Sequence, residues 1–263
     1  MMRRGQALVV VLLLLGVAVT VGLSIVSRSV TEVSVSTAED ESSRALEAAE
    51  AGVESALGGV VAVGSSDTDT FAEASFNVSN TAVGNAQVYE VPYSLSAGEV
   101  ATVDLGGYTG NNVRVCWGSL ETAAVELILY YQGATAVSVG RVGYDPNGTT
   151  RAQNSFSPDA GGGCNGAGYT RSYAYTQMVS LRNDLGMAAG GSPLILRIRA
   201  LYNTQGLPVA VRGLGGDLPT QGSEIISTGQ AGGSTQKLRV IQSKPDLPLM
   251  FDAALFSGTS LIQ

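Results

Sequence analysis

The stretch that most limits how this chain can fold lies at its beginning. A short basic leader, Met1–Gly5, opens a run of 23 uncharged residues from Gly5 to Ser27. As an α-helix rising about 1.5 Å per residue, the run reaches ~34 Å, enough to cross the ~30 Å hydrocarbon core of a bilayer. We therefore predict a membrane-spanning segment over residues 7–27. The arginines before it and the acidic residues after it place the C-terminal bulk of the chain outside.

A cleavable secretory signal is the alternative reading of this run. Gly16–Ser24 contains small residues that suit a signal-peptidase cut. The apolar run is, however, longer than the usual signal core of about 7–15 residues. Its length therefore favours a segment that stays in the membrane.

The helical pattern continues beyond the membrane segment. Apolar residues recur at helical spacing, with glutamates on the opposite face; the set is Leu46, Ala49, Val53 and Ala56/Leu57. Gly58 and Gly59 supply a stop, and no proline precedes Pro92. We predict one helix from Ala7 to Leu57, with the stripe of Leu46, Val53 and Leu57 docked on the rest of the protein.

The weakest part of this helix is the segment with Val30, Val33 and Val35. β-Branched residues among serines and threonines are poor helix formers. We expect bending or local melting there. A short strand is the alternative, but no turn separates the segment from the helix on either side.

The N-terminal region resembles that of type IV pilin-like proteins. Arg4–Val10 and the later segment Ala45–Gly52 are similar to PilX-like minor pilins. The resemblance implies that a prepilin peptidase cuts between Gly5 and Gln6, and that the new amine of Gln6 is methylated. It also implies three sets of partners, namely other pilin subunits, an inner-membrane assembly platform and, before assembly, membrane lipid.

One position departs from the family pattern. The glutamate that major pilins carry near the start of the mature helix falls on Val10. The resemblance then implies a minor subunit that lies at the tip or primes assembly. Gly16 and Gly22 could allow close helix approach or bending, although glycine is also common in membrane helices in general.

The remainder of the chain is predicted to be β-rich. Residues 59–70 are expected to form a polar linker and residues 71–263 an extracytoplasmic domain, with no compelling further division near 170. Alternating apolar residues predict strands at 101–105, 113–117, 125–131, 137–139 and 194–202, and two strands joined by a glycine turn over 225–240. An apolar stretch, 247–256, follows these strands. The fold class is therefore α+β: a long N-terminal helix, membrane-spanning in its first half and amphipathic in its second, before a largely antiparallel β-rich domain.

The two cysteines, Cys116 and Cys164, are expected to pair in an outward-facing domain. Two free thiols in a reducing compartment are the alternative. Because Cys116 and Trp117 lie on opposite faces of a strand, we expect one of them to be less buried.

Chemical signals are sparse. The chain has no histidine, which removes histidine bases and histidine-ligated metals, and we predict no cofactor, no metal site and no catalytic residue. Asp145 and Asp159 could in principle form a carboxylate pair, although turn chemistry explains both. Arg197, Arg199 and the other strand arginines are expected to solvate an outer sheet face. The net charge of −7 disfavours nucleic acid as a partner.

These observations favour a structural and interaction protein over an enzyme. We expect a minor pilin or pseudopilin, first in the cytoplasmic (inner) membrane and then in a surface filament, with the β domain exposed for adhesion or interaction. The alternatives are a single-pass anchored ligand-binding domain that never enters a filament and an anchored hydrolase that uses carboxylates.

Overall fold

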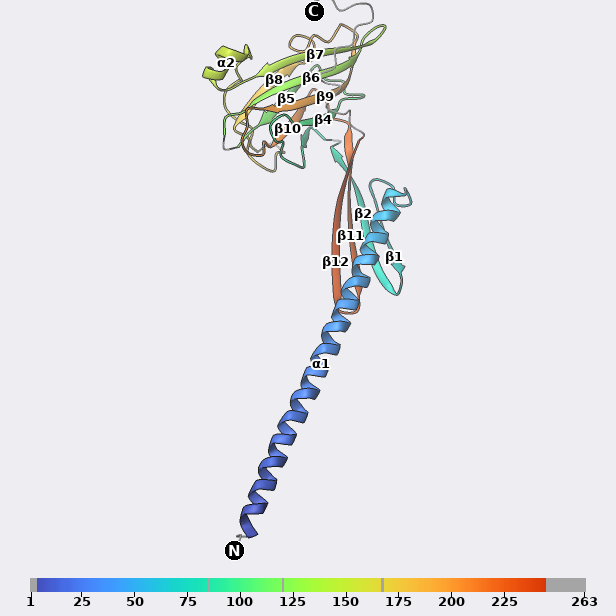
Figure 1. Cartoon of the computed structure of the whole chain (residues 1–263). Coiled ribbons are helices and arrows are strands. Elements are labelled where there is room, and N and C mark those ends of the chain that lie inside the picture. Colours follow the sequence, from blue (N-terminus) through green and yellow to red (C-terminus); the bar gives the residue numbers. More distant parts are fainter. Residues whose placement is uncertain (1–3, 85, 120, 167, 245–263) are drawn as a thin grey trace, which may run out of the picture. The chain divides into compact units, whose positions relative to one another are not determined.

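The computed structural model describes residues 4–84, 86–119, 121–166 and 168–244, with side chains from Val9 onward. One long helix, α1 (Arg4–Leu57), precedes β-rich chain (Figure 1). The described chain divides into two compact units. Among the described residues, the first unit holds α1, the chain up to Thr81, and Ile225–Val240; the second holds Ala82–Glu224 and residues 241–244. The predicted α+β class is confirmed.

Helix α1 is continuous because no proline occurs within it. It ends where the sequence analysis expects. The Gly58 nitrogen donates to the Glu54 oxygen at 2.7 Å, and Gly59 adopts a φ of +79°, which favours glycine. Val30, Val33 and Val35 lie within the helix, so the expected melting is not seen.

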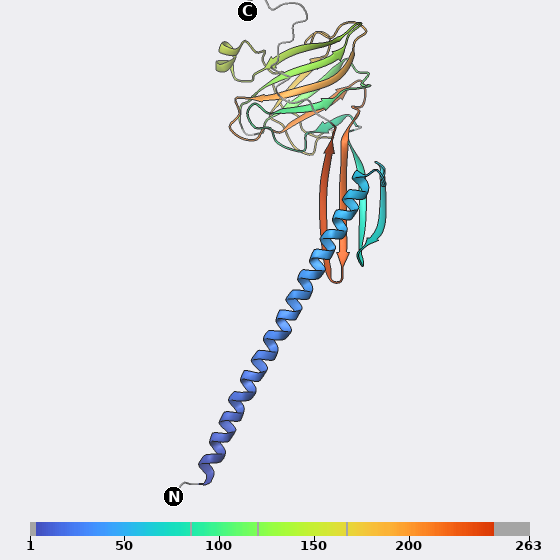
Figure 2. The same ribbon diagram turned by 45° about the vertical axis from the view of Figure 1, so that its right-hand side comes forward.

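The sheet of the first unit has the order β1-β2-β11-β12, with β1 (Ser65–Phe71), β2 (Ala74–Gly84), β11 (Thr220–Ala231) and β12 (Ser234–Ser243). Both views show α1 lying along this sheet with its C-terminal part (Figures 1 and 2). The predicted pair of strands within 225–240 is confirmed. The linker prediction is wrong over 65–70, because these polar residues pair with β2 as a fully exposed strand that carries no apolar signal.

The second unit contains eight strands in two four-stranded antiparallel sheets. One sheet has the order β3-β10-β5-β8 and the other β4-β9-β6-β7. Their bounds are β3 Val88–Glu90, β4 Val100–Asp104, β5 Asn112–Trp117, β6 Ala124–Gln132, β7 Val137–Tyr144, β8 Tyr175–Ser180, β9 Ser192–Leu201 and β10 Val209–Leu214.

Strand pairing in this unit is nested. The first of the eight strands pairs with the last (β3 with β10), the second with the seventh, the third with the sixth, and β6 with β7. This is the arrangement of a jelly roll, a hairpin of four strand pairs rolled into two sheets. A short helix, α2 (Gly148–Asn154), follows β7.

The core of the second unit fills the space between the two sheets. It is built from the alternate apolar residues of strands from both sheets, among them Val103, Trp117, Leu127, Leu129 and Ile198. These residues include the predicted alternating sets of β4, β5 and β6, which are confirmed. The predicted set of β9 is confirmed for Leu196, Ile198 and Ala200, but Tyr202 lies beyond the strand and is 56% exposed. Val137 and Val139 of β7 are both exposed, because they point away from this core.

Candidate functional site

The N-terminal half of α1 is an apolar surface that no other described part of the chain covers. Every residue from 9 to 40 is exposed. Val10 is 57% exposed and Leu13 66%, and the aliphatic side chains surround the helix on all sides. The described chain contains one helix long and apolar enough to cross a membrane. Water is a poor solvent for such a surface, so lipid or other helices must cover it.

Two glycines interrupt the aliphatic surface without meeting any other part of the chain that the structure describes. A Cβ placed on Gly16 or Gly22 has no heavy atom within 4 Å. Any close approach at these glycines must therefore come from another molecule. The predicted cleavage position, Gly5–Gln6, lies in the first turns of the helix, but its side chains are outside the described set.

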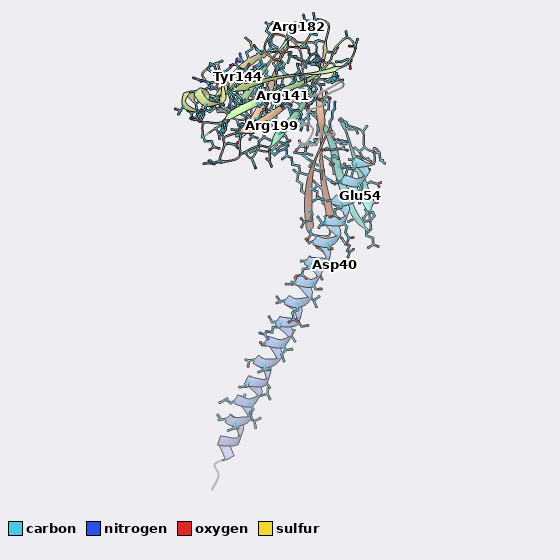
Figure 3. All side chains as sticks on the ribbon, turned by 45° about the horizontal axis from the view of Figure 1, so that its top comes forward. Asp40, Glu54, Arg141, Tyr144, Arg182 and Arg199 are labelled. Atoms are coloured by element: carbon cyan, nitrogen blue, oxygen red, sulfur yellow. A yellow bond between two sulfur atoms is a disulfide. The ribbon has the colours of Figure 1, made fainter. Side chains whose placement is uncertain are left out.

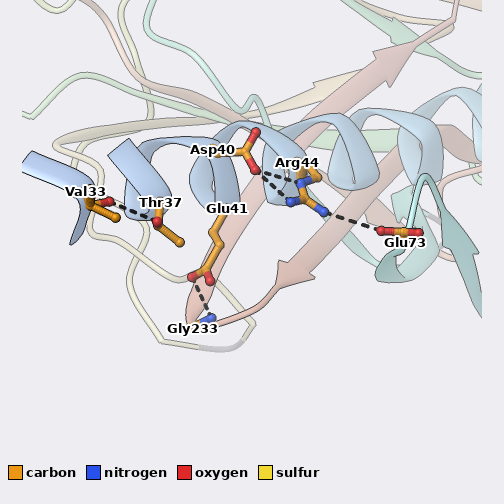
Figure 4. A network of polar contacts seen from close by, with 7 residues as sticks. All are labelled: Val33, Thr37, Asp40, Glu41, Arg44, Glu73 and Gly233. Atoms are coloured by element: carbon orange, nitrogen blue, oxygen red, sulfur yellow. Dashed lines mark hydrogen bonds and ion pairs between the residues drawn. The ribbon is translucent and has the colours of Figure 1, made fainter. Parts of the chain in front are cut away.

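The middle of α1 is polar yet helical. Thr31 donates its hydroxyl to the carbonyl of Ser27, and Thr37 donates to that of Val33, both at 2.9 Å. These bonds engage hydroxyls that would otherwise compete with the helix backbone. In this way the two β-branched threonines are accommodated in the helix. Figure 4 shows the Thr37 bond.

The C-terminal part of α1 docks on the sheet mainly through small residues, which include Ala49 and Ala56 of the predicted pattern but not its leucines. Val53 is buried as expected, but Leu46 is 39% exposed and Leu57 47% exposed. The prediction is wrong for these two leucines. The buried face lies about one residue, or 100°, further round the helix. It is formed by Ala45, Ala48, Ala49, Gly52, Val53 and Ala56.

Small residues are required because the helix backbone lies unusually close to the sheet. A Cβ on Gly229 of β11 would overlap the Ala45 carbonyl oxygen and lie 2.6 Å from the Ala49 nitrogen. A Cβ on Gly52 of the helix would lie 2.8 Å from the Phe76 ring. Glycine on both partners therefore sets the helix–sheet distance, and leucine cannot fit between them.

Polar contacts fix the position of the helix along the sheet. The Gly233 nitrogen in the β11–β12 turn donates to the Glu41 carboxylate at 2.9 Å, and the Gln236 amide donates to the Ser42 hydroxyl at 2.9 Å. Arg44 bonds Asp40 at 2.7 Å and lies 3.7 Å from Glu73 (Figure 4). Docking therefore begins near residue 41, where the exposed apolar half has ended.

In the jelly roll, Cys116 and Cys164 form the predicted disulfide, with Cα atoms 6.0 Å apart. Cys116 and Trp117 are both fully buried, so the expectation that one would be less buried is wrong. Trp117 faces the core. Cys116 faces outward, where the disulfide holds Cys164 and Tyr173 over the β3-β10-β5-β8 sheet.

A carboxylate secures the same loop. Glu90 of β3 accepts hydrogen bonds from the Thr170 backbone and hydroxyl, the Arg171 backbone at 3.4 Å and the Tyr173 hydroxyl at 2.9 Å. Partial burial acts to raise the pKa of Glu90, but the bonds from Thr170, Tyr173 and Arg171 together bring it below its usual value. The ionised carboxylate therefore stabilises the loop.

The two aspartates considered as a catalytic pair serve separate turns. The buried Asp145 carboxylate accepts bonds from the Asn147 backbone, the Thr150 hydroxyl and the Asn154 amide, around α2. Asp159 accepts from the Gly161 backbone at 3.1 Å. Within the described residues, no group of histidine, cysteine, aspartate or glutamate is arranged to hold a metal.

The arginines expected on an outer sheet face are only partly solvated. Arg199 is partly exposed and bonds Glu126 at 3.1 Å, while Arg197 is 1% exposed. The expectation of solvation is therefore wrong for Arg197. The sequence alone shows that the two arginines share a face of β9 but carries no signal that the face is covered.

The chain thus has an apolar N-terminal helix, a small sheet on which the C-terminal part of that helix packs, and a jelly roll. No family model, curated protein sequence or solved structure matches the chain. Functional assignment therefore depends on the helix and its surroundings.

Proposed function

We propose that this protein is a minor pilin or pseudopilin, a non-enzymatic subunit of a type IV pilus or a type II secretion-like filament. Its N-terminal helix anchors it in the cytoplasmic membrane before assembly and packs against other subunits afterwards. The sheet and the jelly roll lie outside and serve adhesion or interaction. The disulfide is in keeping with an oxidising, extracytoplasmic location.

The observation that supports this proposal most is the difference between the two parts of α1: the N-terminal part is exposed and the C-terminal part is docked on a sheet. Residues 9–40 are all exposed, while Glu41 and Ser42 bond the β11–β12 hairpin and residues from Ala45 onward pack on the small sheet. A simple anchor needs only ~20 apolar residues followed by a link. A helix that continues rigidly into a folded unit is suited to holding that unit at a fixed place on a bundle of like helices.

Burial of the apolar half supplies the energy for such a bundle. At ~0.025 kcal/mol per Å² of apolar surface, some twenty aliphatic residues contribute tens of kcal/mol gross, before the entropy of assembly is subtracted. Lateral packing of helices can therefore hold a subunit after it leaves the lipid.

Val10 supports a minor rather than a major role. The first acidic residue of the chain is Glu32, so the apolar segment offers no carboxylate to the terminal amine of a neighbour. A buried carboxylate needs a positive partner, whereas valine needs none. A subunit without this requirement can occupy the tip or prime assembly.

The test is the mature N-terminus, determined by intact-mass and peptide mass spectrometry of the protein purified from membranes of a host with a prepilin peptidase. We expect it to begin at Gln6 with a methylated amine. A start between Gly16 and Ser27 indicates a secretory signal and overturns the proposal. An unprocessed Met1 indicates the anchored binding domain instead.

A further inference from the structure

Two arginines lie directly opposite each other on the outer face of the β3-β10-β5-β8 sheet. Arg114 of β5 is in register with Arg212 of β10. The face is the outer one, because Val113 and Val115, on either side of Arg114, enter the core between the two sheets. Directly opposed residues have Cβ atoms about 4.5–5.5 Å apart, and like charges in this position destabilise a sheet. The stability of the sheet therefore does not explain why the two arginines are paired.

Outward arginines of the other sheet differ in having a carboxylate beside them. Glu126 of β6 accepts from Arg199 at 3.1 Å and from Arg141 at 3.4 Å, and Figure 3 shows both arginines on that sheet. Arg114 has no hydrogen bond or ion pair to any residue that the structure describes. A guanidinium carries five N–H donors and no acceptor. The donors of Arg114 are therefore left for solvent or for a ligand.

Uncharged side chains orient the second arginine of the pair. The Nη2 of Arg212 donates to the Gln87 Oε1 at 3.1 Å, and Arg212 also bonds the hydroxyl of Tyr169. Burial raises the pKa of Tyr169, and the charges of Arg212 and Arg114 act to lower it. Both guanidinium groups therefore lie close to this hydroxyl. A planar guanidinium that is already held in place loses less entropy when it binds a ligand.

The disulfide places Tyr169 beside the arginine pair. Cys116 is two residues from Arg114 on the same face of β5, and it holds Cys164 of the loop that carries Tyr169. The Tyr169 hydroxyl donates to the Cys116 Sγ at 3.3 Å, and its ring packs 5.9 Å from that of Tyr173. The loop thus forms a fixed wall on one side of the two arginines.

A carboxylate on the same face is already engaged by that loop. Glu90 of β3 lies one residue pair further along the strand than Val88, the residue in register with Arg212. The Glu90 carboxylate accepts four hydrogen bonds from Thr170, Arg171 and Tyr173. Its oxygens are therefore directed to the loop and serve to hold it.

We propose that Arg114 and Arg212 form a binding site for a tetrahedral oxyanion, the sulfate or phosphate group of a ligand. One guanidinium satisfies both oxygens of a carboxylate, whereas a sulfate or phosphate group has further oxygens for a second guanidinium. An anion between the two arginines replaces their repulsion by attraction. Met178 of β8, in register with Arg114 and 54% exposed, offers an apolar contact beside the anion. The site gives the jelly roll a binding role that is separate from the filament role of α1.

The first test is protection of Arg114 and Arg212 from phenylglyoxal, measured by peptide mass spectrometry on the full-length protein in detergent micelles. Sodium sulfate or inorganic phosphate replaces sodium chloride at constant ionic strength. A bound anion protects by the factor 1 + [L]/Kd, so an anion concentration of about four times Kd should slow labelling of both arginines about fivefold. Labelling of the exposed Arg182, the internal control, should not change.

The second test uses Arg114→Gln, with protection of Arg212 as the measurement. Loss of the charge-assisted bonds from one guanidinium should raise the sulfate concentration for half-protection about tenfold or more. The matched control is Arg182→Gln, which makes the same change of charge at an exposed arginine elsewhere in the jelly roll. It should leave the half-protection concentration unchanged.

Three outcomes overturn the proposal. Equal slowing at Arg182 shows general screening rather than a site. Protection by sodium acetate as strong as that by sulfate indicates a carboxylate site and removes the tetrahedral assignment. An unchanged half-protection concentration in Arg114→Gln places the anion elsewhere. If this variant does not form the Cys116–Cys164 disulfide, the comparison of sulfate, acetate and chloride on the unaltered protein decides. None of these measurements depends on processing of the N-terminus, so this proposal and the filament proposal fail separately.

Discussion

Replacing Gly229 by alanine tests whether close packing holds α1 on its sheet. The new Cβ meets main-chain atoms of the helix, the Ala45 oxygen and the Ala49 nitrogen, which cannot rotate away. Moving the nitrogen from 2.6 to the ordinary 3.4 Å requires a shift of at least 0.8 Å. A gap of 0.5–1 Å forfeits about a quarter to a half of the dispersion energy of each contact. We therefore expect a loss of about 1–3 kcal/mol, the usual cost of overpacking.

The measurement is amide hydrogen exchange of the full-length protein in micelles. Protection of residues 45–56 should fall by roughly 5- to 150-fold in Gly229→Ala, because it reports the free energy of opening the docked helix. Protection of the jelly-roll strands should not change. The control is Gly148→Ala, where the nearest atom to the new Cβ is a flexible arginine end at 3.6 Å. Protection at 45–56 equal to that of the control would refute the idea that backbone proximity sets the docking.

Three further outcomes are expected. The double variant Cys116→Ala, Cys164→Ala should lower the free energy of unfolding by about 4 kcal/mol, the chain-entropy value for a disulfide with a sequence separation of 48. Denaturant titration measures this loss, and an unchanged unfolding midpoint contradicts it. Glu90 stabilises its loop fully above the ordinary carboxyl pKa, and this stabilisation is lost as pH falls through its lowered pKa. Glu90→Gln should therefore remove the pH dependence of the protection factor of the Thr170 amide, measured relative to its intrinsic exchange rate. Immunogold labelling should find the protein sparse and near filament tips, and Val10→Glu should preserve membrane insertion while spreading label along the shaft; dense shaft labelling of the unaltered protein refutes the tip assignment.

The long helix was predictable because its signals are local. An uncharged run, helical spacing and a glycine stop all lie within the segment that they describe. The docking face was not predictable in the same way. Apolar periodicity gives most weight to large residues such as Leu46 and Leu57, whereas the actual contact selects small ones, and the glycine that demands this, Gly229, belongs to a distant strand.

The β strands show the same contrast. Alternation located β4, β5, β6 and β9, but it says which residues share a face and not which strands pair. The β3–β10 pairing joins Tyr89 with Val211, and no local pattern reports that distance. β1 was missed because its residues are polar on both faces. α2 was missed because it is short, although Asn147 caps its first turn by accepting from the Thr149 nitrogen, a signal that the sequence carries.

The first unit is built from segments that lie far apart in the sequence, so its helix is synthesised well before the strand on which the helix packs. Ala45 and Gly229, which touch in the finished unit, lie 184 positions apart. At 5–20 residues per second, the ribosome needs roughly 10–40 s to make the strand that covers the helix after the helix itself has emerged. Throughout that interval the docking face of the helix, made mostly of alanine and glycine, is not yet covered by β11. A helix face made of leucine would not fit against Gly229, and over the same interval it would expose a larger apolar surface to unwanted association.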